Sequence, residues 1–171
     1  MLKYKNVLRR YILLVIIGFM STSPPVQADV GLNVWGMEFA TLGDESVDHM
    51  AFYPGLSLSL TYEVGSWALS PSLGAEWAAD GEFWGFMAML YADHPINDHL
   101  GFDLILAGMH DQLGSDWAGA EVFVGTGAGL SWFIHERAMI TPNMLLYYGF
   151  RTDTWAIAPG INLWVSLESE D

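Results

Sequence analysis

The sequence contains serine, histidine and acidic residues close together, and these residue types can form a catalytic set. A nucleophilic serine needs a base within hydrogen-bond reach and a third group that orients the base. Two sets offer these residue types: Ser46, Asp48 and His49, and His110, Asp111 and Ser115. They could support acyl transfer, or they could be acidic polar loops in water. The spacing guarantees no hydrogen bond between them, so we assign no catalytic residue.

The histidine and cysteine content bears on metal and cofactor binding. The five histidines are His49, His94, His99, His110 and His135. None has the spacing of metal ligands on one strand face. The absence of cysteine excludes disulfides, thiolate metal sites and a lipid anchor on cysteine. No phosphate loop, nucleotide fingerprint or zinc motif is present. We therefore expect no metal site and no cofactor.

The charges are distributed very unevenly along the chain. Four of the six basic residues lie within the first ten positions, and only Arg137 and Arg151 follow, against 20 acidic residues. Phosphate binding needs clustered lysine and arginine. The sequence therefore argues against nucleic acid as a partner.

Residues 1–28 have the organisation of a secretory signal peptide. A basic segment, an apolar core from Tyr11 to Met20 and a polar segment that ends Val26-Gln27-Ala28 follow one another. A retained membrane anchor is the alternative, but the core is shorter than the roughly 20 apolar residues that span a bilayer. We expect cleavage after Ala28 and a mature chain with a net charge of −18.

The remaining chain alternates between apolar and polar residues with period two, which is typical of β-strands. Eight strands are expected over about 30–42, 52–64, 67–77, 84–93, 100–110, 120–134, 138–150 and 155–167. The first and seventh have mixed faces, so their inward side is not predicted. Long links (43–51, 78–82, 111–118, 151–153) alternate with shorter ones (65–66, 94–99, 135–137). This pattern predicts an all-β, eight-stranded antiparallel up-and-down transmembrane β-barrel over 29–167.

The composition of the two faces predicts which one meets lipid. On most strands one face carries Leu, Val, Ile, Phe and Trp, and the other carries Ser, Gly, Ala, Thr and Asn with a few acids. The apolar set is too bulky for so narrow a lumen, so we expect it to face lipid and the small polar set to face inward. Five tryptophans near strand ends are expected to form an aromatic girdle: Trp67, Trp77, Trp84, Trp132 and Trp155.

In this architecture the chain resembles the small eight-stranded outer-membrane barrels of the OmpA/OmpX kind, although it carries no diagnostic motif. The resemblance implies a Gram-negative outer-membrane location and insertion by the barrel assembly machinery. The alternation of long and short links predicts that both termini lie in the periplasm. Many such barrels end on an aromatic residue, whereas Leu167 stands there in this chain, before an acidic tail over 168–171. The expected role is non-enzymatic, in surface interaction or envelope integrity. The alternatives are a lipid A-modifying acyl hydrolase or acyltransferase, and a narrow pore or carrier for a small apolar compound.

Acidic residues are expected inside the barrel without basic partners. The expected lumen-facing acids are Glu38, Glu63, Glu76, Asp103 and Glu121. Burying unpaired carboxylates is costly, and hydration, protonation or a bound cation could relieve the cost. Further acids crowd the expected outer loops: Asp44, Glu45, Asp48, Asp80, Glu82, Asp111, Asp116 and Asp153. The expected partners are therefore outer-membrane lipid and lipopolysaccharide, through divalent cations.

Four prolines fall inside expected strands, namely Pro54, Pro71, Pro142 and Pro159. Proline removes a hydrogen-bond donor from the ladder. These positions are expected to be bulges or strand starts, or alternatively a local opening in the barrel wall.

Overall fold

The computed structural model describes residues 29–42, 51–77, 83–113 and 121–167. Eight strands make up nearly all of them: β1 (Asp29–Leu42), β2 (Ala51–Val64), β3 (Trp67–Trp77), β4 (Phe83–Asn97), β5 (Leu100–Leu113), β6 (Glu121–His135), β7 (Ala138–Gly149) and β8 (Thr154–Ser166). The expected signal peptide and acidic tail lie outside the described residues, as do most of the expected outer loops.

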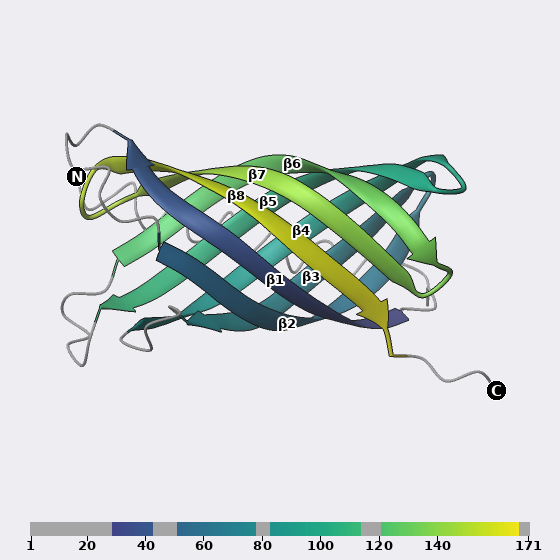
Figure 1. The fold of residues 1–171 in the computed structure, drawn as a ribbon, viewed down its shortest axis with the longest axis horizontal. Coiled ribbons are helices and arrows are strands. Elements are labelled where there is room, and N and C mark those ends of the chain that lie inside the picture. The colour runs from purple at the N-terminus through teal and green to yellow at the C-terminus, as the bar shows by residue number, and fades with distance from the viewer. Residues whose placement is uncertain (1–28, 43–50, 78–82, 114–120, 168–171) are drawn as a thin grey trace.

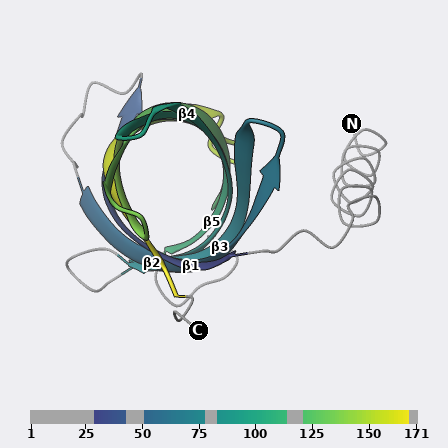
Figure 2. The same cartoon turned by 90° about the vertical axis from the view of Figure 1, so that its right-hand side faces the viewer.

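The strands form one closed barrel in which each strand pairs with its neighbours in the sequence and β8 closes on β1. All pairs are antiparallel, as predicted. Figure 1 shows the barrel from the side, and Figure 2 shows it from one end. Register partners lead from Gly31 through all the strands and back to β1 at Thr41. This stagger of ten residues tilts the strands and fixes the width of the barrel.

The two ends of the barrel differ in their connections. At one end, called here the turn end, two-residue turns lie at 65–66, 98–99 and 136–137, and β1 begins and β8 ends there. The opposite end, called the loop end, carries the other connections, including a turn over 150–153.

The expected link over 94–99 proved much shorter than predicted. β4 continues through Pro95 to Asn97, with an irregular register between these two residues. The Asn97 carboxamide oxygen accepts hydrogen bonds from the backbone N–H groups of His99 (2.9 Å) and Leu100 (3.0 Å). This side chain stabilises a tight turn in a segment whose polar composition had suggested a loop.

The barrel is apolar on its outer wall, unlike a soluble protein, and the described inward side chains are largely buried in its lumen. In β3 the outward Leu73 is 73% exposed, whereas its neighbour Ser72 is buried. The same alternation settles the two strands with mixed faces. In β1 Asn33, Trp35 and Met37 point inward, and in β7 Thr141, Leu145 and Tyr147 do so.

The lumen holds larger side chains than predicted. Trp35, Tyr91 and Tyr147 are buried in it together with several methionines. They fit because glycines lie opposite them on neighbouring strands. A Cβ added to Gly55 would lie 2.3 Å from the Trp35 ring, and one added to Gly125 would lie 2.4 Å from the Tyr147 ring. Large and small residues therefore interlock across strands, which a strand-by-strand pattern does not reveal.

The strand prolines interrupt single ladders without opening the barrel. The register of β2 with β3 skips Leu60–Thr61 against Ser70–Pro71, and that of β6 with β7 skips Leu130–Ser131 against Thr141–Pro142. At each gap two inward hydroxyls hydrogen-bond to each other at 2.9 Å, Thr61 with Ser70 and Ser131 with Thr141. These bonds partly replace the lost ladder contacts, and the barrel remains closed.

Candidate functional site: the apolar belt and the packed lumen

The outer wall presents a continuous belt of exposed apolar side chains. Its members come from every strand and include Val34, Leu58, Leu73, Leu90, Leu106, Leu130, Leu146 and Ile161. Exposed apolar patches of this extent are rare on soluble monomers. Lipid-facing strands of outer-membrane barrels show this arrangement, with an apolar band around the wall.

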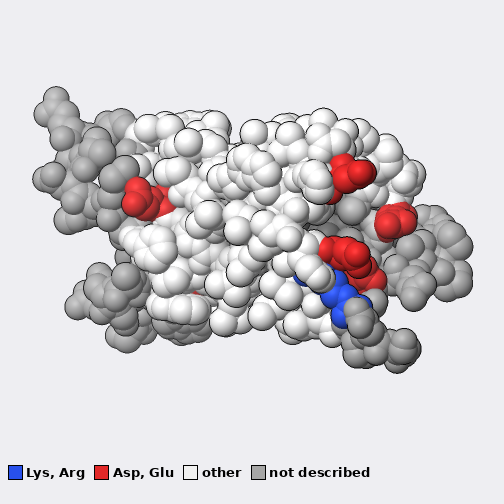
Figure 3. Space-filling model, turned by 45° about the vertical axis from the view of Figure 1, so that its right-hand side comes forward, with Lys and Arg blue, Asp and Glu red and all other residues white. Residues whose placement is uncertain are grey.

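Charged side chains gather toward the two ends of the barrel. On the face shown in Figure 3, acidic residues lie toward both ends and basic residues toward one end, and the described surface between them carries no charge. The turn end carries Glu136 and Arg137, and the loop end carries Arg151 and Asp153. A belt free of charge between two charged rims matches the profile of a lipid bilayer.

The expected girdle tryptophans lie near the two ends of the strands. Trp77 and Trp155 are exposed toward the loop end, and Trp132 is exposed toward the turn end. Trp67, also at the turn end, is half-buried against the His94 ring, with 4.8 Å between ring centroids. The side chain of Trp84 lies outside the described set. The girdle itself remains a prediction.

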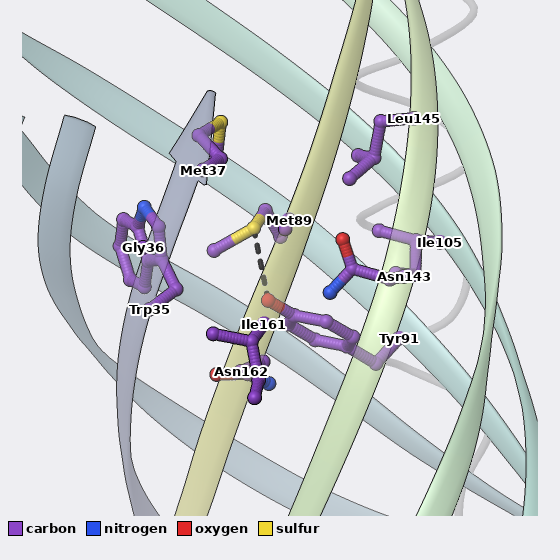
Figure 4. A pocket seen from close by; sticks show the side chains of 11 residues that line it. Trp35, Gly36, Met37, Met89, Tyr91, Ile105, Asn143, Leu145, Ile161 and Asn162 are labelled. Atoms are coloured by element: carbon purple, nitrogen blue, oxygen red, sulfur yellow. Dashed lines mark hydrogen bonds between the residues drawn. The ribbon is translucent and has the colours of Figure 1, made fainter. Parts of the chain in front are cut away.

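The loop-end half of the lumen is filled mainly by apolar side chains. Met87, Met89, Ile105, Leu145 and Tyr147 are all buried there. Figure 4 shows part of this packing near β1 and β8, where the Tyr91 hydroxyl donates a hydrogen bond to the Met89 sulfur at 3.0 Å. A small cavity lined by Trp35, Met89 and Tyr91 has a volume of about 10 Å³. That is near the minimum for a single water molecule.

The turn-end half of the lumen is polar. Hydroxyls dominate it, since Ser57 bonds with Ser72, and the Trp164 indole N–H donates to Ser59 at 3.2 Å. Asn162 donates its amide to the carbonyl oxygen of the Asn33 side chain at 3.3 Å. The small polar lumen predicted from the sequence is therefore correct for this half only.

The structure distributes the five expected lumen acids over different environments. Glu76 and Asp103 lie in the lumen, where they are 1% and 0% exposed. Glu63 shares the inward register of Ser59 but is exposed at the turn end. The side chain of Glu121 is not described. Glu38 is exposed and lies on the same outward face of β1 as Val34, so it is not a lumen residue. The expectation failed because the inward positions of β1 at this level carry Trp35 and Met37 instead.

Glu76 is buried without a hydrogen-bond partner among the described residues. The Trp35 ring lies over Gly55, which is the register partner of Glu76. The Trp35 indole N–H is the donor that interacts with the Glu76 carboxylate. The distance and angle between the two groups do not meet the criteria of a hydrogen bond. Glu76 therefore lies beside a weak donor rather than in an ion pair.

Asp93 is a buried lumen acid that the sequence reasoning missed. It is 8% exposed and lies directly opposite Asp103 on the neighbouring strand. Ser131 donates a hydrogen bond to its carboxylate at 3.2 Å. The signal was available, because Asp93 shares the odd-numbered face of Met87, Met89 and Tyr91. It was overlooked because the strand was expected to end at this residue.

The candidate catalytic residues are only partly within the described set. Ser46, Asp48, His49 and Ser115 lie outside it. His110 lies on the outward face near the loop end of β5 and is half-buried. Among the described residues, no group of three or more His, Asp or Glu side chains is arranged to hold a metal ion.

Several solved structures of similar fold are bacterial outer-membrane barrels. Neisserial surface protein A matches with 14% identity and a TM-score of 0.52, over 82% of this chain and 97% of that one. The N-terminal β-barrel domain of Pseudomonas aeruginosa OprF matches with 16% identity and a TM-score of 0.52, over 81% and 99%. This chain has the fold of the eight-stranded outer-membrane β-barrels.

A third similar structure is that of Ail, the attachment invasion locus protein of Yersinia pestis, in complex with the heparin analogue sucrose octasulfate. It matches with 13% identity and a TM-score of 0.50, over 82% of this chain and 97% of that one. No protein-family model and no curated protein sequence matches this chain. In the described part of this barrel-forming chain, no helix is long and apolar enough to cross a membrane.

Proposed function

We propose that this chain is a non-enzymatic protein of the bacterial outer membrane that contributes to surface interaction or envelope integrity. The observation that carries the proposal is the combination of an apolar belt outside with a packed lumen inside. The belt fits lipid, and side chains such as Met87, Ile105 and Tyr147 leave little room for a solute to pass. Activity is then confined to the outer wall and to the ends of the barrel.

The partner proposed for the loop end is lipopolysaccharide, bound through divalent cations. The links at this end contain most of the acids of the chain outside the strands, including Asp44, Glu45, Asp48, Asp80 and Glu82. Divalent cations can bridge carboxylates and the phosphates of lipopolysaccharide, because both offer hard oxygen ligands.

Thermal unfolding in lipopolysaccharide-containing membranes tests this proposal. Millimolar Mg²⁺ should raise the unfolding midpoint in these membranes, and a variant with Asn or Gln at Asp44, Glu45, Asp48, Asp80 and Glu82 should lose most of that rise. The same variant in phosphatidylcholine membranes is the control. An equal rise in the wild-type chain and in the variant would show that the loop acids do not bind the cations. Single-channel steps in planar bilayers would instead favour a pore.

Lipid A modification is the second candidate function, and the position of His110 gives it some support. This histidine points outward near the loop end, where lipid headgroups would lie. A general base for lipid hydrolysis would need such a place. Replacement of His110, Ser115, Ser46 and His49 by alanine, followed by mass spectrometry of lipid A, tests it. Lipid A that changes on expression of the wild-type chain but not of the variants would establish the enzyme.

A further inference from the structure

Two buried carboxylates face each other in the turn-end half of the lumen. Asp93 of β4 and Asp103 of β5 are direct register partners on the inward face. Directly opposed residues have Cβ atoms about 4.5–5.5 Å apart, which brings their side chains within reach of one ligand. The two carboxylates also act on each other electrostatically.

Neither carboxylate is neutralised by the described side chains. Asp103 is 0% exposed, and neither of its oxygens meets hydrogen-bond geometry, although the Ala92 backbone acts on this carboxylate. Asp93 accepts one hydrogen bond, from Ser131. The basic residues of the described strands and turns are Arg137 and Arg151, which lie at opposite ends of the barrel. Two adjacent buried charges without a counterion would be strongly destabilising.

We propose that Asp93 and Asp103 bind one divalent cation, calcium, with the hydroxyls of Ser131 and Thr141 as neighbouring oxygen ligands. A single divalent ion balances the two carboxylates. Ser131 lies beside Asp93, and Thr141 bonds to Ser131 at 2.9 Å, so the hydroxyls form one cluster with the acids. Asp93 retains 8% exposure, which leaves the site in contact with solvent.

The chemistry of this cluster favours calcium over other divalent ions. Its donors are carboxylate and hydroxyl oxygens, which suit hard cations. Magnesium keeps several water molecules in a strict octahedron, and the packed lumen has little room for them. Calcium accepts irregular sets of protein oxygens and fits a site of this kind better.

Thermal unfolding of the purified barrel in a zwitterionic detergent, without lipopolysaccharide, tests the site apart from the loop-end proposal. Saturating Ca²⁺ should raise the midpoint of the wild-type chain above that in chelator by roughly 5 °C or more. Bound calcium measured by equilibrium dialysis should include one ion per chain that Asp103→Asn removes. Magnesium should give a clearly smaller rise.

Asp103→Asn and Asp98→Asn form a matched pair, because Asp98 is exposed in the turn over 98–99. Asp103→Asn should abolish the calcium-dependent rise and should melt above the wild-type chain in chelator, because one unneutralised charge has gone. Asp98→Asn should keep the rise. Should Asp103→Asn fail to fold, Ser131→Ala provides the second variant, with weakened calcium binding expected. A wild-type midpoint identical in calcium and chelator, or a full rise in Asp103→Asn, would overturn the proposal.

Discussion

At the scale of single residues, the lumen depends on large side chains that lie over glycines. Trp35 covers Gly55, Tyr147 covers Gly125, and the Trp164 ring lies within 2.1 Å of where a Cβ of Gly31 would be. The two residues of each pair lie on different strands, so the pairing of a large side chain with a glycine is not visible in any single segment of the sequence. Packing of this kind explains how an eight-stranded barrel holds aromatic residues and several methionines in its lumen.

A single methyl group at Gly55 should therefore destabilise the barrel. Gly55→Ala puts a Cβ 2.3 Å from the buried Trp35 ring, which has to shift. We expect a loss of about 1–3 kcal/mol in the free energy of unfolding, as for other overpacked cores. Gly108→Ala is the control, because the nearest atom to its added Cβ is 4.0 Å away. Urea titrations in the same detergent measure both, and equal losses would contradict the packing described.

At the residue scale, the alternation of the sequence placed some of the buried acids and misplaced others. The burial of Glu76 and Asp103 followed from their alternation with apolar residues. Glu38 was misplaced because β1 carries apolar residues on both faces, so period two alone does not orient it. Asp93 was missed because the end of β4 was set too early. The opposition of Asp93 and Asp103 depends on register, which the sequence does not state.

At the scale of elements, hydroxyl pairs compensate for proline in the ladders. Thr61 and Ser70 bond where Pro71 interrupts the pairing of β2 with β3, and Ser131 and Thr141 bond beside Pro142. The gap between β1 and β8 beside Pro159 differs, because Ala158 offers no hydroxyl there. Cross-strand hydroxyl pairs stabilise sheets modestly, which suits a role as local replacements.

Removal of one such hydroxyl should weaken the β2–β3 pairing. Thr61→Val keeps the shape of the side chain and leaves the Ser70 hydroxyl without its 2.9 Å partner. We expect a loss of about 1 kcal/mol or somewhat more in unfolding free energy. A double-mutant cycle with Ser70→Ala should give a coupling energy of about 0.5–1.5 kcal/mol. A coupling energy of zero would mean that the bond does not contribute.

The sequence predicted the number and the antiparallel direction of the strands correctly. Period-two alternation is a local property, and it survives because one face of each strand meets lipid. Strand ends were less accurate, since β4 and β5 both run further than expected, to Asn97 and Leu113. Polar residues near strand ends resemble loop residues in composition, and only their pairing distinguishes them.

At the scale of the whole molecule, the account requires that the exposed apolar belt lies in lipid. Leu73→Arg tests this at a position that is 73% exposed near the middle of β3. A charge in the middle of the lipid-facing band should cost about 2–4 kcal/mol of unfolding free energy in phospholipid vesicles. Glu38→Arg is the control, because it exchanges one outward charge for another near the loop end and should cost about 0–1 kcal/mol. Equal costs would place Leu73 outside the membrane.

The most direct test of the central claim is the environment of the belt itself. The chain has no cysteine, so single cysteines can carry a nitroxide label at Leu58, Leu73, Leu106 and Leu130, with Asp98 as the solvent-exposed reference. Electron paramagnetic resonance in phospholipid vesicles then compares collisions with oxygen, which enriches in lipid, and with a water-soluble nickel chelate. The account predicts high oxygen and low nickel accessibility at the four belt positions and the reverse at Asp98. High nickel accessibility around the belt would contradict it.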